Sequence, residues 1–176
     1  MIDPIELTRA LIRCETVTPA EGGAIALLDD ALSGLGFRTH RCNRGEVANL
    51  YARIGTEGPV FGFAGHTDVV PPGDPSDWTH PPFSAAIADD QVWGRGATDM
   101  KSGVACFVSA VAAWLESGGE GSVALLITGD EEGEAKDGTT AILDWMSENG
   151  ETLDHCLVGE PTSREEIGDM LKIGRR

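Results

Sequence analysis

Four short polar turns, each placed where a run of apolar residues ends, hold the side chains in this sequence that are best suited to bind a metal ion. The turns are Gly65-His66-Thr67-Asp68, Thr98-Asp99-Met100, Asp130-Glu131-Glu132-Gly133 and Gly159-Glu160-Pro161. Three of them follow the apolar runs 60–64, 123–127 and 156–158, which we interpret as buried strands. Open α/β sheets bind ligands beyond the carboxyl ends of their strands, so we expect these distant turns to meet at one site.

His66 and Asp68 have a spacing that suits a metal ligand and an acid that orients it. On an extended turn, the carboxylate of Asp68 can accept a hydrogen bond from one imidazole nitrogen of His66 while the other nitrogen faces a metal ion. A lone histidine at the end of a strand is more often a structural hydrogen-bonding residue. The ligand interpretation of His66 therefore depends on the acids in the other turns.

Each acid in the other turns also has a structural alternative. Asp99 precedes a predicted helix and by itself would be an N-cap, although a carboxylate can also bridge two cations about 3.5–4 Å apart. Glu131 and Glu132 repel each other unless cations or a shared proton relieve the charge, so one can ligate while the other transfers protons. Glu160 is either an exposed loop acid or a further ligand. The combined donors suit zinc, cobalt or manganese, and zinc is favoured because such ligands with an open position form hydrolytic centres.

The elements that must position these turns alternate between helices and strands. Capping signals and apolar residues at helical spacing predict helices that begin at Asp3-Pro4, span 24–35, span 101–116 and begin at Asp137-Gly138-Thr139. In the first helix, Glu6 is expected to reach back to the N-cap. Further strands are expected at 37–41 and 48–54. This order predicts a layered α/β domain in which a mixed, mainly parallel sheet is flanked by helices.

Length, charge and cysteines limit the class of protein. The 176 residues suffice for one domain with a substantial core. The net charge of −16 repels nucleic-acid phosphates and anionic lipid head groups, so we expect neither nucleic acid nor a membrane as a partner. The four cysteines are widely spaced and form no C-x-x-C pair, so free thiols are expected. Because the sequence shows no signal peptide or membrane-spanning run, the cytoplasm is the expected compartment.

The ordered motifs resemble those of the zinc-dependent amidohydrolases and exopeptidases, a family that includes aminoacylases, acetylornithine deacetylases and succinyl-diaminopimelate desuccinylases. The matching segments are 64–74, Trp78 with Pro81-Pro82-Phe83, 94–101, 128–133 and 158–162. The similarity covers essentially the whole chain and is greatest to the desuccinylases. The His-Thr-Asp turn alone would be a weak signal, but the ordered set is highly specific for the family.

The resemblance implies a zinc-exopeptidase-like fold and assigns roles to the residues of the turns. His66 and Glu160 would bind one zinc ion, Asp99 would bridge two, Glu132 would bind the second, Glu131 would be the general base and Asp68 would orient His66. The peptide bond after Asp99 would be cis. Zinc would polarise an amide carbonyl and acidify water, and Glu131 would move the water proton to the leaving amine.

The implied substrate is N-succinyl-LL-2,6-diaminopimelate, a small N-acyl amino acid whose hydrolysis to succinate and LL-diaminopimelate serves lysine and cell-wall precursor synthesis. Members of the family are considerably longer and carry a dimerisation domain and a returning catalytic segment that supplies another histidine ligand. Residues 1–176 are therefore expected to be the N-terminal portion of the catalytic domain of a homodimeric enzyme, and to be weakly active or inactive alone.

Several alternatives stay open. A related deacylase or dipeptidase, such as acetylornithine deacetylase, would use the same metal site, and a non-enzymatic metal-binding module would lack turnover. His40, His80 and His155 lie outside the ligand motifs, and packing or solvated roles suffice for them. The segment 171–176 resembles the start of a further strand.

Overall fold

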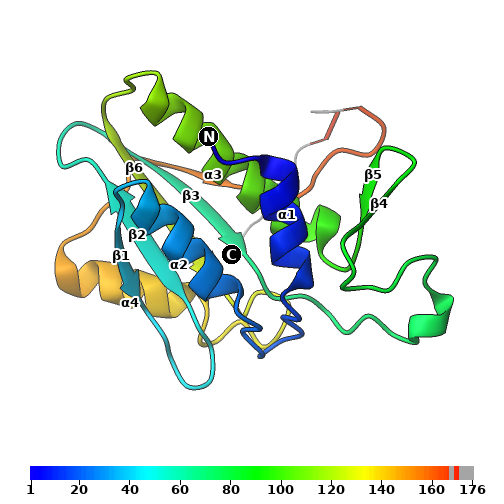
Figure 1. The fold of residues 1–176 in the computed structure, drawn as a ribbon. Helices are drawn as coiled ribbons and strands as arrows, with labels where there is room; N and C mark the ends of the chain where they lie inside the picture. The colour runs from blue at the N-terminus through cyan, green and yellow to red at the C-terminus, as the bar shows by residue number, and fades with distance from the viewer. Residues whose placement is uncertain (167–168, 171–176) are drawn as a thin grey trace.

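A computed structural model describes residues 1–166 and 169–170 and arranges them in three layers. A five-stranded sheet in the order β1-β2-β6-β3-β7 lies between helices α1 (Pro4–Arg13), α2 (Ala24–Gly34) and α3 (Ser102–Glu116) on one face and α4 (Thr139–Asn149) on the other (Figure 1). The strands are β1 Arg38–Arg41, β2 Leu50–Ile54, β3 Val60–His66, β6 Ser122–Thr128 and β7 His155–Val158. The segment 171–176 lies outside the described residues.

The sheet is mixed, but most of its strands run in one direction. β2 pairs antiparallel with both β1 and β6, whereas β3 pairs parallel with β6 and with β7. Only β2 therefore opposes the other strands of this sheet. The predicted layered α/β architecture with a mainly parallel sheet is confirmed.

The central strand β6 is buried along its whole length because helices cover both of its faces. Leu125 packs with residues of α1, α2 and α3, and its neighbour Leu126 packs against α4 through Ile142. This alternation follows from the two-residue period of a strand, which sends successive side chains to opposite faces. The fixed position of β6 in turn fixes where the acidic turn after Thr128 begins.

The helices begin and end close to the predicted positions: α1 Pro4–Arg13, α2 Ala24–Gly34, α3 Ser102–Glu116 and α4 Thr139–Asn149. Asp3 caps α1, since its Oδ1 accepts hydrogen bonds from the amides of Ile5 at 2.8 Å and Glu6 at 3.1 Å. The expectation that Glu6 reaches back to the cap is wrong, because its carboxylate pairs with Arg9 at 2.6 Å instead. A salt bridge one turn along the helix competes for the same side chain.

Three short elements between β3 and α3 were not predicted. They are a 3₁₀ turn at Pro75–Asp77, a hairpin of β4 Ala86–Ala88 with β5 Gln91–Trp93, and a π-helical turn at Ala97–Lys101. Strands of three residues contain too few positions for an alternating pattern to be recognised. The π-helical turn matters most, because it holds Asp99.

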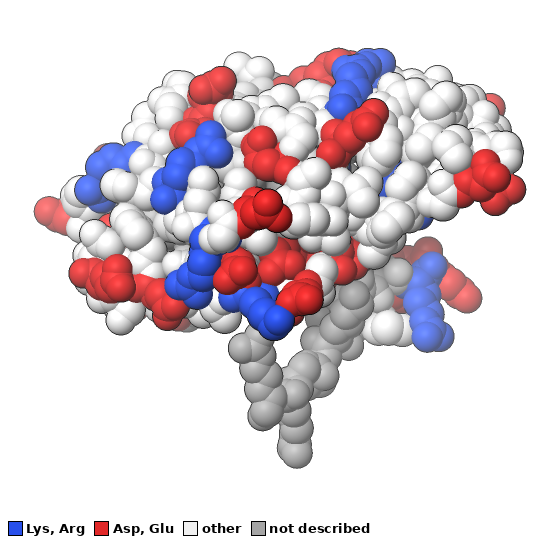
Figure 2. Space-filling view, turned by 90° about the horizontal axis from the view of Figure 1, so that it is seen from below, with Lys and Arg blue, Asp and Glu red and all other residues white. Residues whose placement is uncertain are grey.

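The surface carries mainly acidic charge. Figure 2 shows acidic side chains spread over the face seen from below, with basic side chains standing among them. All four cysteines are free thiols, as expected. Within the described part of the chain, no helix has the length and apolar character needed to cross a bilayer.

Candidate metal centre

The parallel pairing of β3 with its two neighbours brings three of the polar turns to one edge of the sheet. His66 lies opposite Thr128 in the β3–β6 register, and Ala64 lies opposite Val158 in the β3–β7 register. The residues that follow these strands therefore emerge side by side. This arrangement confirms the expectation that the turns meet beyond the carboxyl ends of the strands.

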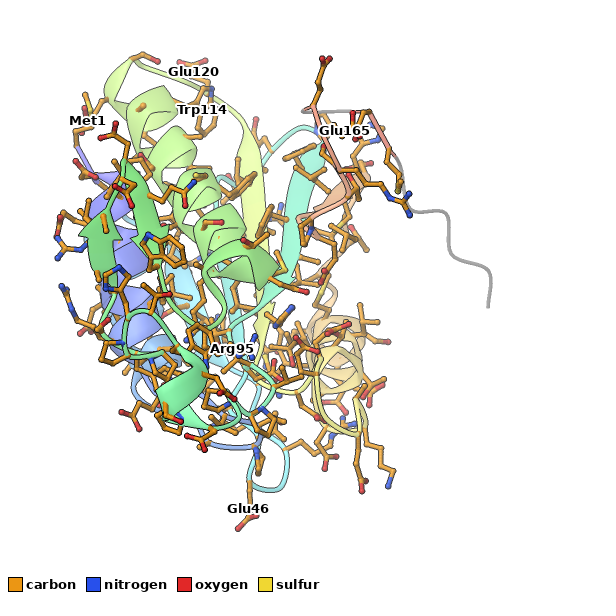
Figure 3. The ribbon with its side chains drawn as sticks, turned by 90° about the vertical axis from the view of Figure 1, so that its right-hand side faces the viewer. Met1, Glu46, Arg95, Trp114, Glu120 and Glu165 are labelled. Atoms are coloured by element: carbon orange, nitrogen blue, oxygen red, sulfur yellow. The ribbon has the colours of Figure 1, made fainter. Side chains whose placement is uncertain are left out.

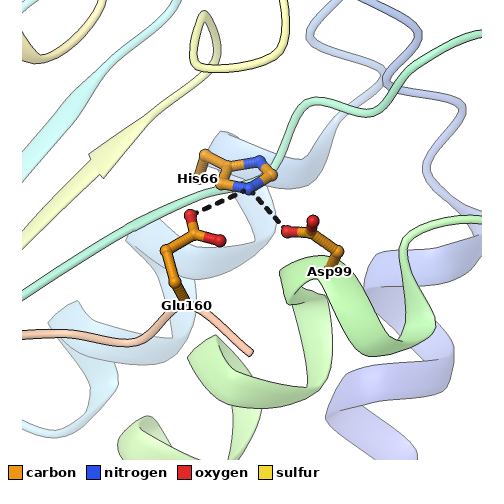
Figure 4. Close-up of side chains that lie close together, drawn as sticks. All are labelled: His66, Asp99 and Glu160. Carbon is orange, nitrogen blue, oxygen red and sulfur yellow. Dashed lines mark hydrogen bonds and ion pairs between the residues drawn. The ribbon is translucent and has the colours of Figure 1, made fainter. Parts of the chain in front are cut away.

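His66 is the centre of the cluster and is only 1% exposed. Its Nε2 atom lies 3.1 Å from Oδ1 of Asp99, 3.5 Å from Oε1 of Glu160 and 3.9 Å from Oε2 of Glu131. Figure 4 shows the imidazole between the carboxylates of Asp99 and Glu160. One ring nitrogen thus faces carboxylates from three separate parts of the chain.

The residues of the cluster form two possible metal-binding groups that share His66. His66, Asp99 and Glu160 have donor atoms within 4.8 Å of one another, and the same holds for His66, Glu131 and Glu132. Asp99 and Glu132 also line a common cavity of about 340 Å³. The structure therefore gathers every residue that was predicted as a ligand or base.

Asp68 acts on the cluster mainly through the backbone. Its carboxylate accepts hydrogen bonds from the amide of Glu131 at 3.1 Å and from the amide of Glu132 at 3.0 Å. Nδ1 of His66 lies 2.9 Å from the carbonyl oxygen of Asp68 and 3.5 Å from its Oδ1. Asp68 therefore contacts the buried imidazole, and it also holds the acidic turn, which the sequence did not reveal.

Asp99 does not cap a helix, so the structural alternative for this residue is excluded. It lies in the π-helical turn Ala97–Lys101, and α3 begins at Ser102 without a side-chain cap. The peptide bond between Asp99 and Met100 is cis, as the resemblance implied. Gly96 opens this turn at a φ of 76°, and a Cβ atom there would lie 2.5 Å from the side chain of Val69. The turn is thereby packed closely against the segment that follows His66.

Lys101 anchors the far side of the same turn. Its side chain is fully buried, and Nζ donates hydrogen bonds to the carbonyl oxygens of Leu11 at 2.9 Å and Cys14 at 3.0 Å. Burial lowers the pKa of Lys101 to about 8, although the charges of Cys14 and Asp68 partly offset this effect. The ammonium group thus ties the end of α1 to the turn that presents Asp99.

The clustered carboxylates give the site a negative potential that favours the binding of positive charge. Burial by itself lowers the pKa of His66, but Asp68 and the carboxylate of Glu160 outweigh burial and raise this pKa from 6.5 to about 9. Burial and then the charge of Asp99 raise the pKa of Glu132. Both directions favour holding protons at the site. A divalent cation would neutralise this negative charge in the same way as protons. The donors are one imidazole nitrogen and several carboxylate oxygens, which fit zinc and similar ions.

Two buried polar residues support the acidic turn and were not predicted. Asn49 is fully buried at the start of the β2 region; it donates to the carbonyl of Asp137 at 2.8 Å and accepts from the hydroxyl of Thr128 at 2.8 Å. Asp130 accepts from the amides of Ala135 and Asp137, both at 3.2 Å. A lone asparagine before a strand gives no sequence signal for such a role.

The remaining histidines stay outside the two metal-binding groups. His40 packs against Trp145 with ring centroids 4.5 Å apart, and His80 meets Trp93 edge to face at 5.4 Å. His155 lies on the exposed strand β7. These positions agree with the packing and solvated roles that were expected.

The chain is similar in sequence to curated bacterial succinyl-diaminopimelate desuccinylases. It is 57% identical over 177 residues to the protein of Paracoccus denitrificans strain Pd 1222, which covers 99% of this chain and 46% of that relative. It is 57% identical over 178 residues to a desuccinylase of Cereibacter sphaeroides, with 99% of this chain and 47% of that relative covered. The chain therefore spans about half the length of the curated relatives it matches.

Solved structures share the fold at lower identity. Human carnosine dipeptidase 1 superposes with a TM-score of 0.76 and 20% identity, covering 91% of this chain and 38% of that protein. The M20 family metallo-carboxypeptidase Sso-CP2 from Sulfolobus solfataricus gives a TM-score of 0.75 and 23% identity, covering 92% and 38% of the two chains. The zinc-exopeptidase-like expectation for the fold is consistent with these neighbours.

A family match covers the segment that contains the whole cluster. Residues 62–172 match the family described as Peptidase family M20/M25/M40. This segment begins within β3, just before His66, and extends beyond Glu160. The chain therefore belongs to peptidase family M20/M25/M40.

Proposed function

We propose that residues 1–176 form the N-terminal portion of the catalytic domain of a metal-dependent succinyl-diaminopimelate desuccinylase. The observation that carries the proposal is the convergence of the carboxylates of Asp99, Glu131 and Glu160 on Nε2 of the buried His66. The 57% identity to curated desuccinylases over 99% of the chain supports the choice of N-succinyl-LL-2,6-diaminopimelate as substrate. The complete protein would act as a cytoplasmic homodimer on this small molecule.

In this proposal, His66, Asp99, Glu132 and Glu160 would hold the metal ions, and Asp99 would be shared between two of them. Zinc is favoured, and cobalt or manganese is compatible with the same donors. When bound, such ions polarise the amide carbonyl of the substrate and lower the pKa of a water molecule. The chain supplies a buried, hydrogen-bonded imidazole whose direction is already set, so little rearrangement is needed to bind an ion.

Glu131 is the proposed general base. Its side chain is 51% exposed, so water and substrate can reach the carboxylate, while its backbone amide is held by Asp68. The carboxylate accepts a proton from the attacking water and then delivers it to the leaving amine. Because Glu131 moves the proton in both directions, its replacement should affect turnover more than metal binding.

The variant Glu131→Gln tests this assignment. General acid–base catalysis contributes about 10²–10⁴-fold to a rate, so succinate release from N-succinyl-LL-2,6-diaminopimelate should fall by that factor. The assay requires the enzyme at the full length of its relatives, loaded with zinc. Zinc content, measured by mass spectrometry, should match that of the unaltered enzyme. Near-normal turnover in this variant would refute the role of Glu131.

The substrate is tested separately from the metal centre. Succinate release from N-succinyl-LL-2,6-diaminopimelate should exceed acetate release from acetylornithine in kcat/KM. Faster deacetylation would assign the chain to a related deacylase and leave the metal site intact.

A second candidate function is that of a non-enzymatic metal-binding module. The observation behind it is the pair of metal-binding groups around His66, because these groups could bind an ion without turnover. The 176-residue chain should then bind zinc but hydrolyse the substrate far more slowly than the full-length enzyme. Equal activity of the two proteins would reject this candidate.

A further inference from the structure

Arg95 lies in the segment that leads into α3 (Figure 3), and it lines the same cavity as Asp99 and Glu132. Its amide donates a hydrogen bond to the carbonyl of Pro82 at 2.7 Å. Its guanidinium carbon lies 5.1 Å from the centre of the Trp78 ring, and Trp78 is itself held by a 2.9 Å hydrogen bond from Nε1 to the carbonyl of Pro72. Backbone and side chain are thus both fixed by neighbours. The contact with the indole ring therefore fixes the orientation of the planar guanidinium.

The guanidinium of Arg95 nevertheless has no polar partner within the described part of the chain. Its Nε atom is buried without a hydrogen-bond acceptor, and no carboxylate there forms an ion pair with it. In a chain with 29 acidic and 13 basic residues, most arginines could find an acid. Arg53, whose Nε is also buried without an acceptor, still pairs with Glu151 through Nη1. A guanidinium has five donors, and the terminal nitrogens of Arg95, which are not buried, form no hydrogen bond or ion pair among the described residues, so they can donate to an acceptor on another molecule.

A cavity of about 340 Å³ joins Arg95 to the metal centre. Residues 94–99 line it together with Val70 and Glu132, so it contains two of the proposed metal ligands, Asp99 and Glu132. A molecule that fills this cavity would lie against Arg95, Asp99 and Glu132 together. Neither Asp99 nor Glu132 pairs with Arg95, and both acids are engaged by metal ions in the proposed function.

We propose that Arg95 binds a carboxylate group of the substrate and thereby positions the amide bond at the metal centre. The inference rests on the proposed function. A planar guanidinium with free donors matches a carboxylate in charge and in fork geometry, and such charge-assisted contacts are the strong ones. N-succinyl-LL-2,6-diaminopimelate carries carboxylates on both sides of its amide bond. Arg95 is accordingly a specificity-determining residue that favours acidic over neutral acyl amino acids.

The test compares Arg95→Met with Arg95→Lys in the zinc-loaded, full-length enzyme. Losing charge-assisted hydrogen bonds should lower kcat/KM for N-succinyl-LL-2,6-diaminopimelate by about 10–100-fold, mainly through a higher KM. The lysine variant keeps the charge without the fork and should lose less. Arg44→Met, which removes an exposed arginine paired with Asp144, is the matched control and should leave kcat/KM unchanged.

Substrate analogues separate recognition from a structural effect. The N-butyryl analogue lacks the carboxylate of the succinyl group. Succinyl amides of simple amines keep that carboxylate but lack the carboxylates of the diaminopimelate part. The loss caused by Arg95→Met should disappear for the analogue that lacks the contacted carboxylate, which also identifies that group. An equal loss for all analogues would show that Arg95 only supports the loop, and would overturn the proposal, as would an unchanged kcat/KM for the intact substrate.

Measuring the binding of the two reaction products tests the role of Arg95 without relying on hydrolysis, so a failure of this role can be told from a failure of the proposed function. In calorimetric titrations with succinate and with diaminopimelate, Arg95→Met should weaken the binding of one of them by about 10-fold or more. This weakening in an enzyme that cannot hydrolyse the succinyl substrate would reject the desuccinylase assignment but support carboxylate binding by Arg95. Unchanged binding of both probes would overturn the role of Arg95 even in an active desuccinylase.

Discussion

Asp68 is the residue through which the histidine turn and the acidic turn are held together. Its carboxylate accepts hydrogen bonds from the amides of Glu131 and Glu132, while its carbonyl accepts from His66. All three neighbours belong to the proposed catalytic machinery, and Asp68 itself is buried. A change at Asp68 should therefore disturb several functional side chains at once without removing a metal ligand.

Asp68→Asn should reduce the affinity for zinc. The amide group that replaces the carboxylate loses an acceptor for the backbone amides, and residues that orient ligands typically change metal affinity by about 10–100-fold. Competition with a chromophoric chelator measures this affinity. Asp74→Asn is the control, since Asp74 is an exposed cap of the 3₁₀ turn at Pro75–Asp77. An unaltered affinity in Asp68→Asn would show that the acidic turn keeps its position without this carboxylate.

The sequence was sufficient to identify the individual candidates at the site but not all of their contacts. His66, Asp99 and Glu160 could be predicted because each stands in a short polar turn next to a periodic element. The hydrogen bonds from Glu131 and Glu132 to Asp68 depend on the path of the chain after β6, which no local pattern encodes. The support from Asn49 was missed for the same reason.

The π-helical turn Ala97–Lys101 is the element that aims Asp99 at His66, and Lys101 fastens it to the end of α1. The folded-state pKa of Lys101 is about 8, below its ordinary value of 10.5. Below pH 8 the lysine is charged in both folded and unfolded states, and the folded state bears the cost of burial. As the pH rises from 8 to 10.5, the unfolded chain keeps the proton longer, so the contribution of Lys101 to stability increases.

Lys101→Met should reveal this titration. The free energy of unfolding of the unaltered chain minus that of the variant should rise by about 1–3 kcal/mol between pH 8 and pH 10. Urea denaturation at several pH values measures the difference. Lys136→Met should not reproduce the rise, because the exposed Lys136 has a raised pKa and therefore the opposite sign. A difference that does not vary with pH would contradict the account of Lys101.

The long elements could be predicted and the short ones could not. Helices α1 to α4 present repeated apolar positions and capping residues, and β6 presents a continuous apolar run, so their patterns are readable locally. The β4–β5 hairpin and the turn at Ala97–Lys101 are shaped by contacts with α1 and with the segment after β3. Such long-range contacts have no counterpart in the local sequence.

Among the described residues, the sheet ends in two edge strands, β1 and β7, and β7 is the more apolar of the two. β7 pairs with β3 on one side, and all of its residues are exposed, including Leu157 at 50% and Val158 at 60%. Phe61 of β3 is also exposed, at 42%. An uncovered edge strand with apolar side chains is a common contact surface between molecules.

The 176-residue chain should therefore self-associate with increasing concentration, and Leu157→Lys should reduce the association. A lysine on an edge strand opposes pairing with another chain because the charge would have to lose its water. Sedimentation velocity over a range of concentrations measures the effect. Leu143→Lys is the matched control, because Leu143 is exposed to a similar extent, at 48%, but belongs to helix α4 and not to strand β7. Monomers at every concentration, or equal association in both variants, would contradict the prediction.

Anomalous diffraction from crystals of the chain grown with zinc tests the central claim most directly. Data on either side of the zinc absorption edge should give a strong peak between His66, Asp99 and Glu160. A second, weaker peak should lie between Asp99 and Glu132. Zinc peaks found only elsewhere, with these side chains too far apart to share an ion, would contradict the proposed metal centre and the chemistry built on it.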